Sequence, residues 1–419
     1  MTGTIVVVGG GASGLMAAGV AAAYGANVVL LEKTKRLGAK IRIFGKGRCN
    51  ITNTVDLPEF IKNYPENGRF LYSALTRFSN WDTINFFNEL GVETKIERGQ
   101  RVFPVSDDAD QVANALVRHA RNNGAKIFSQ KAVRKLILSD DGRIAGVETT
   151  DNEFFDADAV ILATGGASYP GTGSTGDGFL LAKQVGHTIQ KPFPSLVPLR
   201  VKESWVKSVA GVSLRNVEIT IDNGKESDRA FGEMLFTHFG VSGPIVLTLS
   251  RKVAKWLENK ESKVELTIDL KPALSFEILE RRVQRDFNKY IRKQLKNSLD
   301  DLLPKSLIPI VIIESGIEPE KYVNQVTKAE RRQLVNTLKA LRLTIVDTLG
   351  IPAAIVTAGG VNLTEIDPRT MRSKLIENLY FAGEVIDIDG FTGGFNLQAA
   401  FSTGYLAGIS ATNHGERRD

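Results

Sequence analysis

The sequence is poor in the residues that build disulfides and metal sites. It contains one cysteine, Cys49, and four histidines in 419 residues. A single cysteine excludes an internal disulfide and fits a reducing compartment, so we expect a cytoplasmic protein. Because the histidines form no cluster with the cysteine, zinc and iron–sulfur centres are not expected, and we predict no metal.

Charged side chains are absent from residues 1–31. Hydropathy alone would flag this stretch as a signal peptide or a membrane helix. It lacks a basic leading segment and a cleavage pattern, and the glycines at 9–11 interrupt it, so both interpretations are rejected. No later segment is apolar enough to span a bilayer, and we therefore expect no membrane association.

The same stretch carries a phosphate-binding pattern. An apolar run over 5–8 leads into G-x-G-x-x-G at 9–14, which opens an expected helix over 13–24. Gly9 allows a sharp turn out of the strand, Gly11 leaves room for a pyrophosphate, and Gly14 lets the helix lie close to the sheet. The diphosphate is expected to meet the free N–H groups and the positive dipole end of the helix.

A second expected strand, over 27–31, ends at Glu32, whose carboxylate is placed to accept hydrogen bonds from ribose hydroxyls. A lone G-x-G-x-x-G is a weak signal, because glycine triplets arise by chance. Strand, glycines, helix, strand and acid in this order predict a dinucleotide-binding α/β domain at the N-terminus.

The length of the chain predicts more than one domain. Past the segment Pro-Phe-Pro at 192–194 the pattern changes to short strands and helical stretches, and from residue 355 glycine-rich apolar strands return. We predict a discontinuous Rossmann-like domain and an inserted cap domain. Their expected bounds are 1–192 and 351–419 for the Rossmann-like domain, and 193–350 for the insert, with a small β-barrel at about 193–270, a helix near 244–257 and a helical part at about 271–350.

The positive charge of the chain is localised. The net charge is +6, and between Lys271 and Arg342 there are 15 Lys and Arg against 9 Asp and Glu, an excess equal to that of the whole chain. We interpret this excess as the solvated face of long helices. The alternative is a surface for an anionic partner such as RNA or a phosphorylated substrate.

Five further segments resemble known flavoproteins. The glycine turn at 163–166 and the segment 175–186 are similar to the fumarate reductase and succinate dehydrogenase flavoprotein superfamily. The segments 45–53, 383–387 and 393–398 resemble, more specifically, the bacterial YhiN/BaiN-like flavoproteins. The resemblance covers nearly the whole chain, including the insert.

The resemblance implies that FAD is the cofactor, in an FAD/NAD(P)-binding Rossmann-like fold. Members of the superfamily with covalent FAD use a histidine in the N-terminal third, whereas the first histidine here is His119, so non-covalent FAD is expected. The residues expected to hold FAD are Gly9, Gly11, Ala12, Ser13, Gly14, Glu32, Lys33, Lys40, Gly47, Arg48, Cys49, Asn50, Val133, Ala163, Thr164, Gly165, Gly383, Glu384, Gly393, Gly394, Phe395 and Asn396.

Two residues are candidates for catalysis. Arg48 is either a clamp on FAD or an electrophile for a substrate carbonyl. His238 lies in a glycine-rich segment of the insert and is the candidate general acid, with a structural role as the alternative. Cys49 is expected to pack beside the flavin; without a second cysteine it cannot support a dithiol mechanism.

The implied activity is that of an oxidoreductase. A second G-x-G-x-x-G, at 171–176, is interpreted as part of the flavin site, so NAD(P)H is expected to bind only transiently as electron donor. One branch of the family reduces double bonds conjugated to a ketone in steroids, which favours an enone-like small molecule as acceptor.

The alternative is an RNA-modifying or RNA-binding flavoprotein, because some tRNA-modifying enzymes share the fold and the insert is basic. We interpret the sequence as lacking a basic segment with interleaved aromatic residues, and it has no cysteine pair. We therefore expect a small-molecule substrate and no specific binding of nucleic acid.

Overall fold

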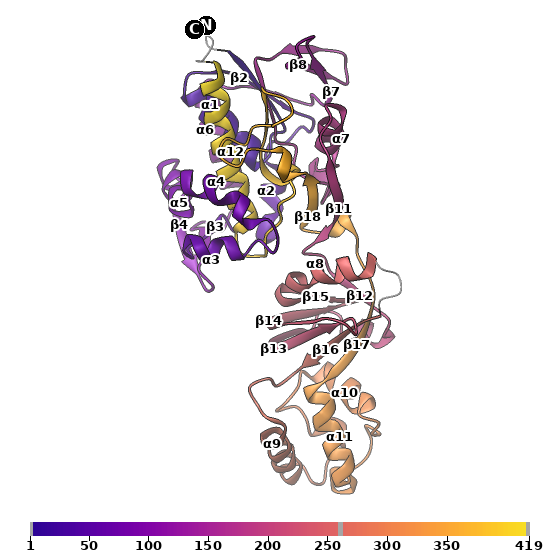
Figure 1. Cartoon of the computed structure of the whole chain (residues 1–419). Helices are drawn as coiled ribbons and strands as arrows, with labels where there is room; N and C mark the ends of the chain where they lie inside the picture. The colour runs from indigo at the N-terminus through magenta and orange to yellow at the C-terminus, as the bar shows by residue number, and fades with distance from the viewer. Residues whose placement is uncertain (1–2, 259–262, 416–419) are drawn as a thin grey trace. The chain divides into compact units, whose positions relative to one another are not determined.

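The computed structural model describes residues 3–258 and 263–415. The chain divides into two compact units (Figure 1). The first unit comprises Met1–Phe193 and Ile355–Asp419, and the second comprises Pro194–Ala354.

A five-stranded parallel sheet is the centre of the first unit. Its strand order is β19-β10-β1-β2-β6, and the strands are rich in Val, Ile and Leu because both faces of a parallel sheet are covered. The strands are β1 (Thr4–Val8), β2 (Asn27–Glu32), β6 (Lys126–Ser129), β10 (Ala159–Leu162) and β19 (Leu379–Phe381).

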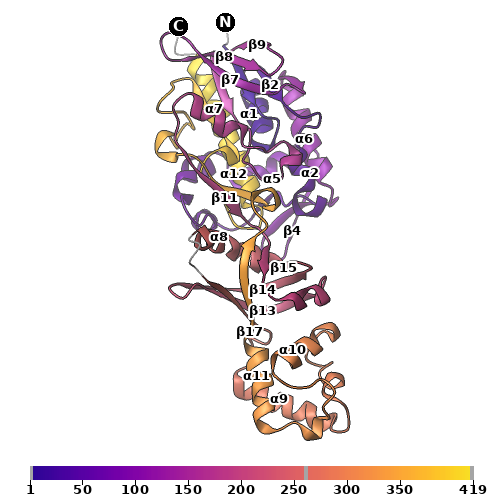
Figure 2. The same ribbon diagram turned by 90° about the vertical axis from the view of Figure 1, so that its right-hand side faces the viewer.

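Helices cover this sheet, and α1 packs against both α6 and α12 (Figure 2). Because α1 and α12 lie far apart in the sequence, their contact joins the two chain segments of the unit. The helices of the first unit are α1 (Ala12–Ala23), α2 (Ala39–Ile43), α3 (Leu57–Lys62), α4 (Tyr72–Arg77), α5 (Asn80–Glu89), α6 (Ala109–Asn122), α7 (Asp177–Gln184) and α12 (Phe395–Gly415).

Three smaller sheets complete the first unit and its borders. Two of them have the strand orders β3-β5-β4 and β7-β8-β9, and the third is the pair β11-β18. Their strands are β3 (Thr52–Asn53), β4 (Thr94–Glu97), β5 (Arg101–Pro104), β7 (Val133–Leu138), β8 (Ile144–Thr149), β9 (Phe154–Asp156), β11 (Ile189–Ser195) and β18 (Val356–Val361).

The second unit contains a closed barrel with the strand order β12-β15-β14-β13-β16-β17. In β16, Val264, Leu266 and Ile268 are buried and alternate with less buried polar residues, which is the period of a strand with one face in the core. The barrel strands are β12 (Leu199–Val201), β13 (Ser213–Asp222), β14 (Ser227–Thr237), β15 (Gly240–Ser242), β16 (Val264–Asp269) and β17 (Leu341–Thr348).

The barrel strand β17 corrects one expectation. It lies in the stretch 271–350, for which the sequence pattern predicts helices, and it closes the barrel by pairing with both β16 and β12. Leu341, Leu343 and Ile345 are buried in alternation with Arg342 and Thr344, so the sequence carries a strand signal there. The helical pattern that precedes residue 341 obscures this signal.

Four α-helices belong to the described part of the second unit, and two of them begin at a side-chain cap. Thr327 and Glu330 form a reciprocal capping box at α11, and the Ser275 hydroxyl caps α9. The helices are α8 (Pro244–Glu258), α9 (Phe276–Lys289), α10 (Ile308–Glu314) and α11 (Lys328–Lys339). The predicted fold class, a Rossmann-like α/β domain with a small barrel and a helical part, is confirmed.

Candidate cofactor-binding site

A pocket lies at the carboxyl ends of the central strands of the first unit. Its walls include 9–13 at the start of α1, 31–34 after β2 and 163–165 after β10. Open α/β sheets bind ligands at this edge, outside the carboxyl ends of the strands. Asn396, Leu397, Ala399 and Ala400 of α12 add a further wall from the C-terminal segment.

Two glycines at the start of α1 have different physical roles. A Cβ on Gly14 would lie 1.9 Å from the Gly9 carbonyl oxygen, so only glycine permits this approach of helix to strand. A Cβ on Gly11 would meet no heavy atom within 4 Å. Gly11 therefore faces open space in the pocket, as a residue beside a bound pyrophosphate must.

The Glu32 carboxylate is held in place by backbone donors. Its Oε2 accepts a hydrogen bond from Gly10 N at 2.7 Å, and its Oε1 accepts one from Thr34 N at 2.7 Å. The residue is only 9% exposed and lines the pocket. Each carboxylate oxygen keeps a further lone pair, which suits Glu32 to accept from ribose hydroxyls.

Lys33 links the end of β2 to the second glycine-rich motif. Its ammonium group donates to the Thr175 hydroxyl and, at 2.6 Å, to Asp177 Oδ2 at the start of α7. Burial raises the pKa of Asp177, but the hydrogen bonds from Lys33 and Thr175 outweigh it and the net pKa is lowered. Asp177 therefore stays ionised, and the second G-x-G-x-x-G meets the wall of the same pocket.

A second charged cluster lies at the side of the pocket formed by α2 and the segment after β19. Lys40 Nζ lies 2.7 Å from Glu384 Oε2 and 2.7 Å from the Ser168 hydroxyl. Glu384 Oε1 accepts hydrogen bonds from Thr357 N and the Ser168 hydroxyl. Both charged side chains are 18% exposed, so the pair places a neutralised, largely buried carboxylate on the wall.

Most of the predicted cofactor residues line this pocket. They are Gly9, Gly11, Ala12, Ser13, Glu32, Lys33, Lys40, Val133, Ala163, Thr164, Gly165, Gly383, Glu384 and Asn396. The prediction omitted other lining residues, among them Thr34, Arg36, Phe44, Lys131, Gly173, Ser174, Ile388 and Leu397. The second glycine motif was a signal for Gly173 and Ser174, whereas the others carry no distinctive pattern.

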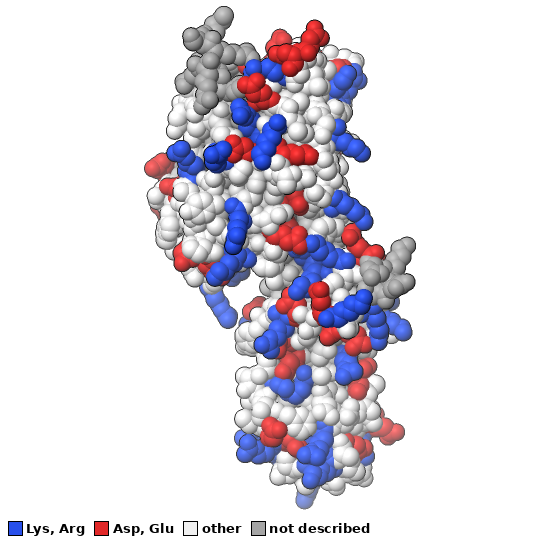
Figure 3. Space-filling view, viewed as in Figure 1, with Lys and Arg blue, Asp and Glu red and all other residues white. Residues whose placement is uncertain are grey.

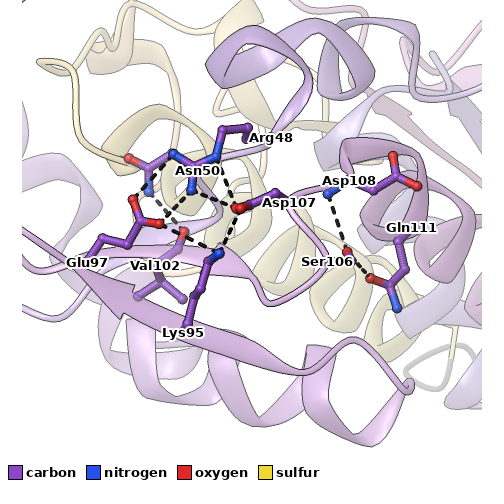
Figure 4. A network of polar contacts seen from close by, with 9 residues as sticks. All are labelled: Arg48, Asn50, Lys95, Glu97, Val102, Ser106, Asp107, Asp108 and Gln111. Carbon is purple, nitrogen blue, oxygen red and sulfur yellow. Dashed lines mark hydrogen bonds and ion pairs between the residues drawn. The ribbon is translucent and has the colours of Figure 1, made fainter.

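Arg48 lies elsewhere, in an ion-pair network that Figure 4 shows. Its guanidinium donates to Glu97 at 2.5 Å and to Asp107 at 2.6 Å, and it lies 4.3 Å from the centre of the Phe103 ring. The hydrogen bonds to Glu97 and then Asp107 raise the pKa of Arg48. Arg48 is not among the residues that line the pocket, and its role as a clamp on FAD or as an electrophile for a substrate carbonyl stays a prediction.

The other predicted residues outside the pocket pack the surrounding loops. Asn50 Nδ2 donates to the carbonyls of Thr52 and Val102, and Gly47 has a left-handed φ of 83° in the preceding turn. These interactions fix the path of the chain into β3. Their contribution to the pocket is therefore indirect.

The glycine turn before α12 also packs away from the pocket wall. A Cβ on Gly394 would lie 2.4 Å from the Thr52 carbonyl oxygen, and the Gly393 carbonyl accepts from Asn53. The Phe395 carbonyl accepts from the Tyr64 hydroxyl at 2.8 Å. Gly394 thus packs closely against the backbone of β3. Asn396 is the first residue of α12 that lines the pocket.

Cys49 is fully buried and is not on the pocket wall. Burial raises the pKa of its thiol to about 12, so the thiol stays protonated at neutral pH. Since only the thiolate is a nucleophile, redox or covalent chemistry at Cys49 is disfavoured, and its packing role follows from its place in the core.

We expect Cys49 to resist alkylation by iodoacetamide in the folded protein at pH 8. A thiol with a pKa of about 12 has a thiolate fraction on the order of 10³-fold lower than an exposed thiol, and burial blocks access further. Mass spectrometry should show an unlabelled native chain and full labelling after denaturation in urea. Rapid labelling of the native protein would contradict the buried position.

His238 lies in the second unit, between β14 and β15, and is exposed, with its ring against Phe239. Its role as a proton donor stays a prediction.

Within residues 3–258 and 263–415, no group of three His, Cys, Asp or Glu side chains is arranged to hold a metal ion. Over the same residues, no helix combines the length and apolarity needed to cross a membrane.

The chain is similar to characterised enzymes over its whole length. It is 37% identical over 413 residues to a 3-dehydro-bile acid delta(4,6)-reductase of Clostridium scindens, covering 97% of this chain and 98% of that one. It is 33% identical over 408 residues to a ribosomal RNA dihydrouridine synthase of Haemophilus influenzae, covering 97% of each.

Solved structures share the fold of this chain. The open conformation of a flavocytochrome c3 fumarate reductase matches with a TM-score of 0.55 at 17% identity, over 99% of this chain and 78% of that one. The family model of the HI0933-like protein Rossmann domain matches residues 3–410. The chain therefore belongs to the HI0933-like family, the group of flavoprotein oxidoreductases that its motifs resemble.

Proposed function

We propose that the chain is an FAD-dependent reductase that uses NAD(P)H to reduce a carbon–carbon double bond conjugated with a carbonyl group. The observation that carries the proposal is the pocket, whose walls run from Glu32 past Gly11 to Asn396. Adenosine, diphosphate and flavin would follow one another along these walls. The residues fit the cofactor, because Gly11 leaves open space and Glu32 keeps lone pairs free.

FAD supplies the hydride-transfer chemistry when it is bound. The protein supplies binding and electrostatics. N–H groups of the first turn of α1 would hold the diphosphate, and Glu32 would orient the ribose. On the side of the pocket formed by α2 and the segment after β19, the ion pair of Lys40 and Glu384 offers the cofactor a fixed polar surface without a net charge.

The names of the two relatives describe one kind of reaction. In a Δ4 steroid with a 3-oxo group, and in uracil, the double bond that is reduced is conjugated with a carbonyl. In both cases a hydride adds to the β-carbon and a proton adds to the α-carbon, so that the double bond becomes saturated. This shared chemistry supports a conjugated acceptor and leaves open whether it is a free small molecule or a base in RNA.

Anaerobic stopped-flow spectroscopy of the FAD-loaded protein tests the proposal. NADH or NADPH should bleach the flavin absorbance, and a conjugated acceptor such as 2-cyclohexenone, a 3-oxo-Δ4 steroid or uridine-containing RNA should restore it. The saturated ketone cyclohexanone is the matched control and should have no effect. Bleaching by neither nucleotide, or reoxidation by none of the conjugated acceptors, would refute the proposal.

A further inference from the structure

Nearly all of the excess positive charge of the chain lies in thirteen residues at the end of α9. Residues 281–293 contain six Lys or Arg and one acid, Asp286, which gives them an excess of five out of the net +6 of the whole chain. The acid is only 4% exposed and is paired with Arg282 at 2.9 Å. We call these residues the basic segment.

The basic segment faces solvent because the apolar side of α9 packs into the core of the second unit. Leu279, Val283 and Phe287 are buried in the core of that unit. Arg281 and Arg285, one helical turn apart, are exposed on the other side. Figure 3 shows exposed Lys and Arg side chains on the lobe that carries α9 and α11, with acids among them.

Several cations of the basic segment are available to a ligand. Among the described residues, Arg285 and Arg292 have no ion-pair partner, and both are exposed. The ammonium groups of Lys289 and Lys293 lie 4.7 and 4.5 Å from the centre of the Tyr290 ring. The ring is thus in contact with two cations, of which Lys289 is also paired with Asp301.

This arrangement corrects the interpretation that the sequence lacks a basic segment with interleaved aromatic residues. The run Lys289, Tyr290, Ile291, Arg292 and Lys293 is such a segment. A count of charge over the 72 residues from 271 to 342 hides it, because the range holds eight further acids outside residues 281–293. In the structure, Glu280 pairs with Arg331 and Arg332, Glu320 with Lys296 and Glu330 with Lys321, all cations outside the basic segment.

We propose that the basic segment is a docking surface for RNA. Four of its six cations are arginines, whose planar guanidinium groups match phosphate oxygens, and the half-buried Tyr290, whose hydroxyl donates to Asp301, adds an aromatic ring among them in the sequence. A lipid surface is disfavoured, because the apolar face that would enter a bilayer is buried in the core. The proposal rests on the proposed function, in which uracil belongs to the class of conjugated acceptors.

The test is an equilibrium binding titration with the full-length, FAD-loaded protein. The probe is a fluorescein-labelled RNA hairpin with uridines in its loop, followed by fluorescence anisotropy at several salt concentrations. The variant carries Arg285→Glu, Arg292→Glu and Lys293→Glu. The matched control carries Lys126→Glu, Lys135→Glu and Lys183→Glu, which changes the net charge equally at exposed positions of the first unit.

We expect the variant to bind RNA on the order of 10- to 100-fold more weakly near 100 mM salt, with a salt dependence lower by about 2 to 3 in log–log slope. The control should keep at least a third of the native affinity. Equal losses in both proteins, equal affinity in the native protein and the variant, or no RNA binding by the native protein would each overturn the proposal.

Two further measurements separate the possible failures. Turnover of 2-cyclohexenone with NAD(P)H should be unchanged in the variant, which also shows that the variant is folded. The native protein, the variant and the control could all fail to turn over any conjugated acceptor while RNA affinity still depends on the basic segment. In that case the proposed function is refuted, but the assignment of the basic segment as an RNA-docking surface is supported. Preferential binding of phosphatidylglycerol vesicles over RNA through these residues would overturn the surface as an RNA site.

Discussion

Gly11→Val is expected to abolish FAD binding while the protein stays folded. The position has an ordinary φ of −82°, and a Cβ there would meet no heavy atom within 4 Å, so the apoprotein accepts the side chain. The valine methyl groups would occupy the space in which the diphosphate meets the N–H groups of α1. We expect the dissociation constant for FAD to rise on the order of 10³-fold or more, which corresponds to about 4 kcal/mol.

The measurement is a titration of the apoprotein with FAD, followed by flavin fluorescence, together with thermal unfolding of the apoprotein. Gly14→Val is the contrasting variant. Its Cβ would lie 1.9 Å from the Gly9 carbonyl oxygen, so α1 must move away from β1 and the apoprotein itself should be destabilised. Normal FAD content in a folded Gly11→Val protein would show that the diphosphate does not bind beside residue 11.

Lys40→Met is expected to weaken both stability and FAD binding. The substitution keeps the length of the side chain but leaves the Glu384 carboxylate without its cation, 18% exposed on the pocket wall. An uncompensated, largely buried charge should lower the free energy of unfolding by about 1 to 3 kcal/mol. The same charge would repel the oxygens of the cofactor, and we expect a loss of FAD affinity on the order of 10-fold.

The double variant Lys40→Met with Glu384→Gln separates charge from packing. It removes both charges, so FAD affinity and part of the lost stability should return relative to Lys40→Met alone. Chemical denaturation of the apoprotein and FAD titration measure the two quantities. Additive losses in the double variant would mean that the pair is not coupled and that Lys40 acts through its contact with Ser168.

Local signals explain why the first βαβ unit was predictable. The apolar run of β1, the glycine turn and the apolar helix α1 follow one another within 24 residues, and Glu32 ends the next strand. Turn geometry and hydrophobic period depend on neighbouring residues alone. The sequence by itself therefore determined the dinucleotide-binding edge and the family, and it placed Gly9, Gly11 and Glu32 on it.

Contacts between distant residues were decided only by the tertiary structure. Arg48 forms hydrogen bonds to Glu97 and Asp107, 49 and 59 positions away, and no local pattern predicts these partners. Gly394 packs on Thr52 from the other end of the chain, and β17 closes a barrel begun at β12. No periodicity encodes such partners, because they meet through the folding of the whole chain. For the same reason, only the tertiary structure showed that Arg285 and Arg292 are exposed and that, among the described residues, neither has an ion-pair partner.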